Sequence, residues 1–314
     1  MNNKITVTGA NKFFFVFSAL FLIFQLLLGF LSTIYGGEVL DRNTYRIILV
    51  NEYVIILIPI LIYSFAKKFN LKEAFRLNKL GLLPALLIAL ISLPAYFAAS
   101  MINTVMIYLL QFIGSVPSQP IPVPGNIKEL LIGILIIAVS PGICEELLNR
   151  GILLKAYEKR GSMKAVVITA IFFGIFHFDI TNFFGPVFLG LIIGYYVIRT
   201  NSILAGMLAH FLSNTIAELF QYFGGKEQAL SPTVTVSLGD LGDAVIYGIA
   251  GLILVGILLR LFKSVTEGKS SLIPSIGSIK SDIISIATHW PIMVVVLEYL
   301  VVAGLTLLTI AVGQ

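Results

Sequence analysis

Three charged residues lie close together inside an apolar stretch of the chain. Glu145 and Glu146 are adjacent, Arg150 follows four residues after the second, and the apolar run extends from Leu130 to Leu154. An ionisable side chain at membrane depth costs about 2.5 to 3.5 kcal/mol on insertion scales. Carboxylates retained at that cost indicate a functional site, in which they could move protons or bind a cation.

Two histidines are candidates to join this site, because His177 and His210 each lie in another apolar run. At about 1.5 Å of rise per residue, Glu145 lies about 15 Å, His210 about 12 Å and His177 about 20 Å from the side that holds the basic loops. Three separate spans therefore place polar side chains at a similar depth. We expect them to converge on one buried site.

The spacing within each helix separates two tasks for the adjacent carboxylates. Residues four apart share a helix face, so Glu146 is predicted to pair with Arg150. Glu145 is rotated by about 100° from its neighbour and is left free for chemistry. Pro141, just ahead of the acidic pair, should weaken the helix and free a carbonyl group.

Two further pairs share a helix face in the same way. His210 and Asn214 are four residues apart in one apolar run. Phe173 and His177 are four apart in another, so that the phenyl ring is expected to pack beside the imidazole.

The composition assigns the whole chain to the membrane. It is 58% hydrophobic and only 12% charged, with a mean hydropathy of +0.98, whereas soluble domains have roughly 25% charged residues. The predicted fold is an all-α polytopic bundle of about eight to nine transmembrane helices. The spans are expected near 13–34, 45–66, 80–113, 127–155, 163–179, 183–199, 202–223, 241–262 and 290–312.

The basic residues predict the orientation of the bundle. If the nine spans cross the membrane alternately, the N-terminus and three clusters of Lys and Arg lie on one side. Cytoplasmic loops carry an excess of Lys and Arg. We therefore expect an integral protein of a bacterial plasma membrane with a cytoplasmic N-terminus. The net charge of +5 then needs no nucleic-acid partner. The clusters are Lys67, Lys68, Lys72, Arg76 and Lys79; Lys155, Lys159, Arg160 and Lys164; and Arg260, Lys263 and Lys269.

Three motifs carry a resemblance to a known family. The string EELLNRG at 145–151 resembles the EExxxR motif of the CPBP family of intramembrane proteases. This family includes the type II CAAX prenyl endopeptidases and Abi-like proteins of bacteriocin processing or immunity. Residues 173–177 resemble its FxxxH motif and residues 210–214 its HxxxN motif, in the family's order. Asn149 departs from the family's usual Phe and could hydrogen-bond to Glu145.

The resemblance covers residues 128–222, which divides the chain into three regions. Residues 1–127 would form N-terminal spans with a basic cytoplasmic loop, and 128–222 the CPBP-like catalytic core. Residues 223–314 would add C-terminal spans, joined by a serine-rich stretch at 264–285 that we interpret as a linker or surface segment.

The family resemblance implies hydrolysis of a peptide bond within the membrane. Glu145 is assigned as the general base, with His177 positioning and polarising the water. His210 and Asn214 would donate hydrogen bonds to the oxyanion, and the pair formed by the second glutamate and the arginine would support them. The implied substrate is a membrane-associated peptide or a prenylated or otherwise lipidated protein, next to membrane lipid.

A zinc-dependent reading stays open beside the metal-free one. Glu145, His177 and His210 are an alternative set of zinc ligands, with Glu146 as the base, as in a metalloprotease. The chain has no HExxH motif. We favour the metal-free site by a small margin and assign no cofactor.

Two other classes of function use the same residues. Buried carboxylates and histidines serve proton relays and cation sites in transporters and ion pathways. A non-catalytic membrane protein could keep the site as a binding pocket. Transporters often contain paired inverted halves, but we find no second copy of the acidic helix.

Overall fold

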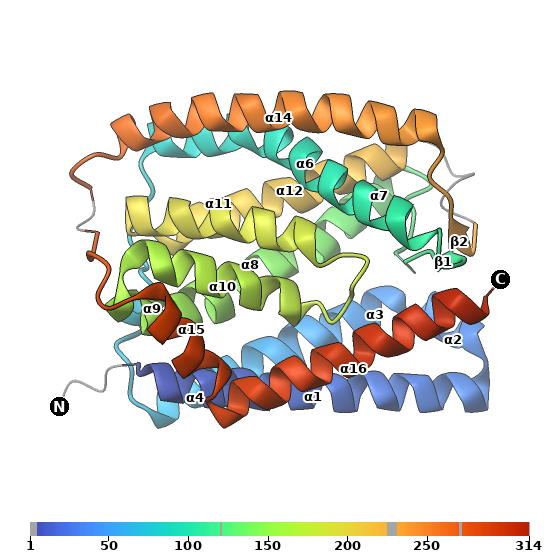
Figure 1. Ribbon diagram of the computed structural model, residues 1–314, viewed down its shortest axis with the longest axis horizontal. Helices are drawn as coiled ribbons and strands as arrows, with labels where there is room; N and C mark the ends of the chain where they lie inside the picture. Colours follow the sequence, from blue (N-terminus) through green and yellow to red (C-terminus); the bar gives the residue numbers. More distant parts are fainter. Residues whose placement is uncertain (1–4, 120, 225–230, 270–271, 314) are drawn as a thin grey trace.

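The computed structural model describes residues 5–119, 121–224, 231–269 and 272–313, and these segments are mostly helical (Figure 1). Within these segments, seven helices are long and apolar enough to cross a membrane, and two apolar helices are shorter. These nine correspond in order to the nine predicted spans. The predicted class, an all-α polytopic membrane bundle, is confirmed.

Five of the long helices are continuous, and two are composite. The continuous ones are α1 (Val7–Tyr35), α6 (Leu82–Leu110), α12 (Ile203–Gly224), α14 (Leu238–Val265) and α16 (Trp290–Val312). The composite span Thr44–Ala66 joins α3 (Thr44–Leu49), the π-helical segment η1 (Val50–Leu57) and α4 (Ile58–Ala66). The span expected at 80–113 is thus a single helix, with Pro94 inside it.

The composite span Ile127–Arg160 carries the acidic pair and changes its helical geometry several times. It consists of α7 (Ile127–Gly133), π-helical η2 (Ile134–Val139), α8 (Ser140–Glu146), π-helical η3 (Leu147–Leu153), α9 (Leu154–Tyr157) and the 3₁₀ turn η4 (Glu158–Arg160).

Shorter elements complete the fold. The two short apolar helices are α10 (Ser162–Phe176) and α11 (Phe184–Thr200). The other helices of the described segments are α2 (Gly37–Arg42), α5 (Leu71–Ala74) and α15 (Ile279–Ala287). Strands β1 (Val116–Pro117) and β2 (Thr233–Val234) pair antiparallel. The serine-rich stretch 264–285, predicted as a linker or surface segment, includes most of α15, and its residues 270–271 lie outside the described residues.

The helices that carry the motifs lie in the middle of the bundle. Figure 1 shows α14 along α6 on one side, α1 and α16 on the other, and α8, α10, α11 and α12 between them. Aromatic stacking joins α1 to α10, with ring centroids 5.1 Å apart for Phe14 and Phe172 and 4.6 Å for Phe17 and Phe176. The outer helix α1 thus packs directly against the motif-bearing helix α10.

The outer surface of the bundle is apolar. Large hydrophobic side chains on α1 and α14 are well exposed, for example Leu26 at 74% and Ile246 at 66%. Such exposure along whole helices is what lipid contact requires. The chain is an integral membrane protein.

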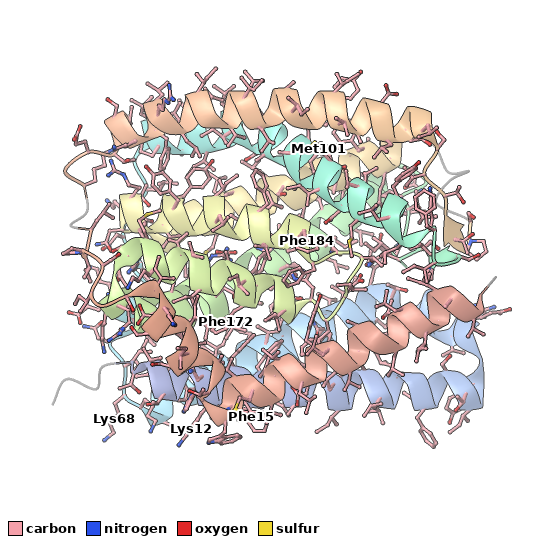
Figure 2. All side chains as sticks on the ribbon, in the orientation of Figure 1. Lys12, Phe15, Lys68, Met101, Phe172 and Phe184 are labelled. Carbon is pink, nitrogen blue, oxygen red and sulfur yellow. The ribbon has the colours of Figure 1, made fainter. Side chains whose placement is uncertain are left out.

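Glycines set the close approach of α14 to α6. A Cβ atom on Gly251 would lie 2.5 Å from the carbonyl oxygen of Pro94, and one on Gly248 would lie 2.3 Å from the Cβ of Met101. Figure 2 labels Met101 on α6, beside α14. Gly256, on the same helix, has no such neighbour within 4 Å.

We therefore expect Gly251→Ala to lower the thermal unfolding midpoint in detergent, because backbone must move to accept the methyl group, at a cost of about 1 to 3 kcal/mol. Gly256→Ala is the matched control and should leave the midpoint unchanged or slightly raised, since Ala is the better helix former. Equal midpoints for the two variants would contradict the packing.

Candidate active site

Pro141 interrupts the helix just before the acidic pair, and α12 compensates for the interruption. Proline has no N–H, so the carbonyl of Ile137 loses the donor that an α-helix would supply. The side-chain amide of Asn214 donates to this oxygen at 2.9 Å. The carbonyl that the sequence predicted to be free is therefore satisfied by the HxxxN motif.

The predicted ion pair between Glu146 and Arg150 is present and deeply buried. Nη1 of Arg150 lies 2.7 Å from Oε1 of Glu146, and the two side chains are 1% and 0% exposed. Nη2 of Arg150 donates to the carbonyl of Gly190 at 3.2 Å. The guanidinium carbon also lies 4.7 Å from the ring centroid of Phe173, in a cation–π contact.

Small residues make room for this pair. A Cβ atom on Gly206 of α12 would lie 2.6 Å from Oε2 of Glu146, and one on Gly190 of α11 would lie 3.0 Å from the Cα of Ala170. The absence of side chains at these two positions lets α12 approach the carboxylate and lets α11 approach α10. The close approach of α11 also brings the Gly190 carbonyl to Arg150.

His210 connects the two carboxylates. Its Nδ1 lies 3.0 Å from Oε1 of Glu146, and its Nε2 lies 4.0 Å from Oε2 of Glu145. Glu146 therefore contacts His210 as well as Arg150, although the sequence suggested only the second partner. A carboxylate on one imidazole nitrogen fixes the ring orientation and directs the other nitrogen outward, here toward Glu145.

The Glu145 carboxylate is buried but little engaged. The residue is 7% exposed, and Oε2 has no hydrogen-bond partner among the described residues. Asn149 does contact Glu145, as the sequence suggested, but its amide donates to the backbone carbonyl at 3.1 Å. That arrangement leaves the carboxylate available for other partners.

His177 caps the C-terminal end of α10 and lies beside the same phenyl ring. Its Nδ1 lies 2.7 Å from the carbonyl oxygen of Phe173. Since a carbonyl only accepts, Nδ1 carries the proton, and Nε2 of the neutral ring is an acceptor. The Phe173 ring centroid lies 5.0 Å from that of His177 and 5.6 Å from that of His210, edge-on in both cases. The predicted packing of Phe173 on His177 is confirmed.

The structure thus brings the candidate residues together to different degrees. Glu145, Glu146, Arg150 and His210 form one contiguous cluster, and His177 reaches it through the Phe173 ring. Asn214 contacts the interrupted backbone of the acidic span.

The candidate zinc ligands are not arranged as a metal site. Within segments 5–119, 121–224, 231–269 and 272–313, no three His, Cys, Asp or Glu side chains gather closely enough to hold a metal ion. Glu145, His177 and His210 are thus not gathered into a three-ligand group in this structure, and the zinc alternative stays a prediction. We derive no catalytic step through a metal.

One buried carboxylate near the site was missed by sequence reasoning. Glu52, on the π-helical segment η1, is 3% exposed and interacts electrostatically with Glu145. Asn51 donates to its Oε1 at 3.2 Å, and Tyr53 Oη lies 3.2 Å from Ser140 Oγ on α8. A charge inside the apolar run 45–66 was the available signal, but no motif accompanies it.

Comparison with known proteins agrees with this geometry. The family model described as type II CAAX prenyl endopeptidase, Rce1-like, matches residues 127–216. This range holds all three motifs and the whole cluster around Glu146. Searches of the curated proteins and of the solved structures found no match. Residues 127–216 are thus similar to the Rce1-like type II CAAX prenyl endopeptidases, and the resemblance to CPBP intramembrane proteases is confirmed.

Proposed function

We propose that this protein is an intramembrane endopeptidase in which Glu145 activates the water that hydrolyses a peptide bond. The family implies protease activity. The observation that carries the mechanism is the buried carboxylate of Glu145, whose Oε2 has no hydrogen-bond partner among the described residues and lies 4.0 Å from Nε2 of His210. This distance is too long for a direct hydrogen bond, so the two groups can act separately on one substrate.

In the proposed reaction, Glu145 takes a proton from water as the oxygen attacks the scissile carbonyl carbon. His210, protonated on both nitrogens and stabilised by the Glu146 carboxylate, donates its Nε2–H to the developing oxyanion. Glu145 then passes its proton to the amide nitrogen. The C–N bond breaks, and a carboxylic acid and an amine are released.

His177 is proposed to position the attacking water. Its Nε2 can accept a hydrogen bond from water, because Nδ1 is held by the Phe173 carbonyl. In this neutral form the ring cannot donate to an oxyanion, which supports giving that task to His210.

Asn214 is proposed to act mainly as a positioning residue. Its amide is engaged with the Ile137 carbonyl, so the bond fixes α12 against η2. His210 lies one turn earlier on α12 and is held in register by this contact. The expected donation from Asn214 to the oxyanion would have to use its remaining N–H.

The proposed substrate is a membrane-associated peptide or a prenylated or otherwise lipidated protein. The matching family is named for prenyl endopeptidases, which supports this class. We propose further that the N-terminus and the basic loops face the cytoplasm of a bacterium, because three Lys/Arg clusters lie on that side of the predicted topology. Substrate would then enter from the inner leaflet.

We expect Glu145→Gln and His210→Ala each to lower the cleavage rate at least about 100-fold, the lower range for loss of an acid–base group. The assay is cleavage of prenylated and unprenylated peptides by the purified protein in detergent. Glu298→Gln on α16 is the control, since it removes a carboxylate from another membrane span.

Unchanged cleavage in both site variants would exclude this assignment. If the wild-type protein cleaved no peptide of a broad panel, a non-catalytic binding role or a transport role would be favoured instead.

Glu146→Gln is expected to reduce both stability and cleavage. It leaves the Arg150 charge buried without a counterion, at a cost of about 3 to 5 kcal/mol. The double variant E146Q/R150M removes the unpaired charge and should recover much of the thermal unfolding midpoint. Its cleavage rate should stay low, because His210 still lacks its carboxylate; recovery of both quantities would reduce Glu146 to a purely structural role.

A metal chelator separates the two ways of activating water. We expect phenanthroline to leave the cleavage rate of the purified protein unchanged. Loss of cleavage that is restored by added zinc would overturn the metal-free mechanism and favour the ligand set of Glu145, His177 and His210.

A further inference from the structure

A cavity of about 820 Å³ opens at the end of the bundle that carries the N-terminus, away from the proposed active site. Its wall has an excess of positive charge. The basic side chains that line it are Lys68, Lys72, Arg76, Lys155 and Lys159, and the acidic ones are Glu73 and Glu158.

Arg76 is the unusual member of this cavity. It is 3% exposed, has a φ of 49°, and pairs with Glu158 through Nη2. Its Nε and Nη1 are buried and receive no acceptor from the described residues. Burial lowers the pKa of the guanidinium, and the Glu158 carboxylate opposes that shift. Two buried nitrogens whose N–H groups have no acceptor are costly, so an acceptor is missing from this site.

The shape and charge around Arg76 indicate which acceptor is missing. A guanidinium presents its N–H groups as a planar fork that matches two oxygens of a phosphate. Glu158 is already engaged by Arg76 and by the hydroxyl of Ser162 at 3.3 Å. Four lysines and one glutamate remain on the wall, so the site favours an anion.

The cavity also lies beside the ends of two candidate membrane spans, the level at which lipid phosphates are expected. Lys68 and Lys72 follow the end of α4, and Lys155 lies in the last turns of the acidic span. Figure 2 labels Lys68 at the end of the bundle where α1 begins. Basic residues next to a span are attracted to anionic lipid headgroups by about 1 kcal/mol each.

We propose that this cavity binds a phosphate-bearing anion at the membrane surface, with Arg76 as the fork and Lys68 and Lys72 as flanking charges. The lysines select for net negative charge and the fork for paired oxygens. The site is independent of the proposed hydrolytic function.

The test measures the thermal unfolding midpoint of the full-length protein in a neutral detergent, titrated with three probes. These are dihexanoylphosphatidylglycerol, dihexanoylphosphatidylcholine and inorganic phosphate. The anionic lipid should raise the midpoint in a saturable way, and the zwitterionic lipid should not. A matching rise with inorganic phosphate would identify a free phosphate as sufficient, whereas a rise with the anionic lipid alone would identify the lipid headgroup.

Variants separate the cavity from general surface charge. K68Q/K72Q should weaken the apparent affinity for the anionic lipid by about fivefold per lysine. K12Q/K280Q removes the same charge from exposed positions outside the cavity and should leave the affinity unchanged.

The variant R76K tests the fork itself. It retains a cation for Glu158 but lacks the fork, so it should keep most of the ligand-free midpoint and lose the rise of the midpoint with the anionic lipid. Equal weakening in both double variants, or no rise with any probe in the wild type, would overturn the proposal.

Discussion

The buried carboxylate of Glu146 is the group on which the centre of this protein depends. It receives a guanidinium from its own helix and an imidazole from α12, with both partners on the same oxygen. A charge at this depth is tolerated only with such partners, because an unpaired one costs several kcal/mol. The same contacts orient His210 toward Glu145. The same carboxylate therefore contributes both to the packing of these helices and to the geometry of the site.

Several departures from regular helix structure make that interaction fit. Gly206 removes the side chain that would collide with the Glu146 carboxylate, and Gly190 brings a backbone carbonyl to Arg150. Pro141 removes a backbone N–H donor, and the side-chain amide of Asn214 on α12 donates to the carbonyl left without it. Each of these features would weaken an isolated helix. Together they let α8, α11 and α12 pack around charges that a uniform bundle would exclude.

The sequence predicted what depends on neighbours along one helix. Apolar runs located the nine helices, and four-residue spacing predicted the Glu146–Arg150 and Phe173–His177 contacts. Contacts between helices were harder to predict, because the periodicity of a single sequence does not say which helix faces pack together. The Glu146–His210 pair and the nearby Glu52 are of this kind.

The acidic span also links the two polar regions of the molecule. Glu145 and Glu146 lie in the middle of this span, and Lys155 and Glu158 line the basic cavity near its end. At the rise of an α-helix, Glu145 and Lys155 are about 15 Å apart along the span. Between them lies the π-helical segment η3, whose wider turns depart from the α-helical register. The active-site cluster and the basic cavity therefore share one span but are separated by a change in its helical geometry.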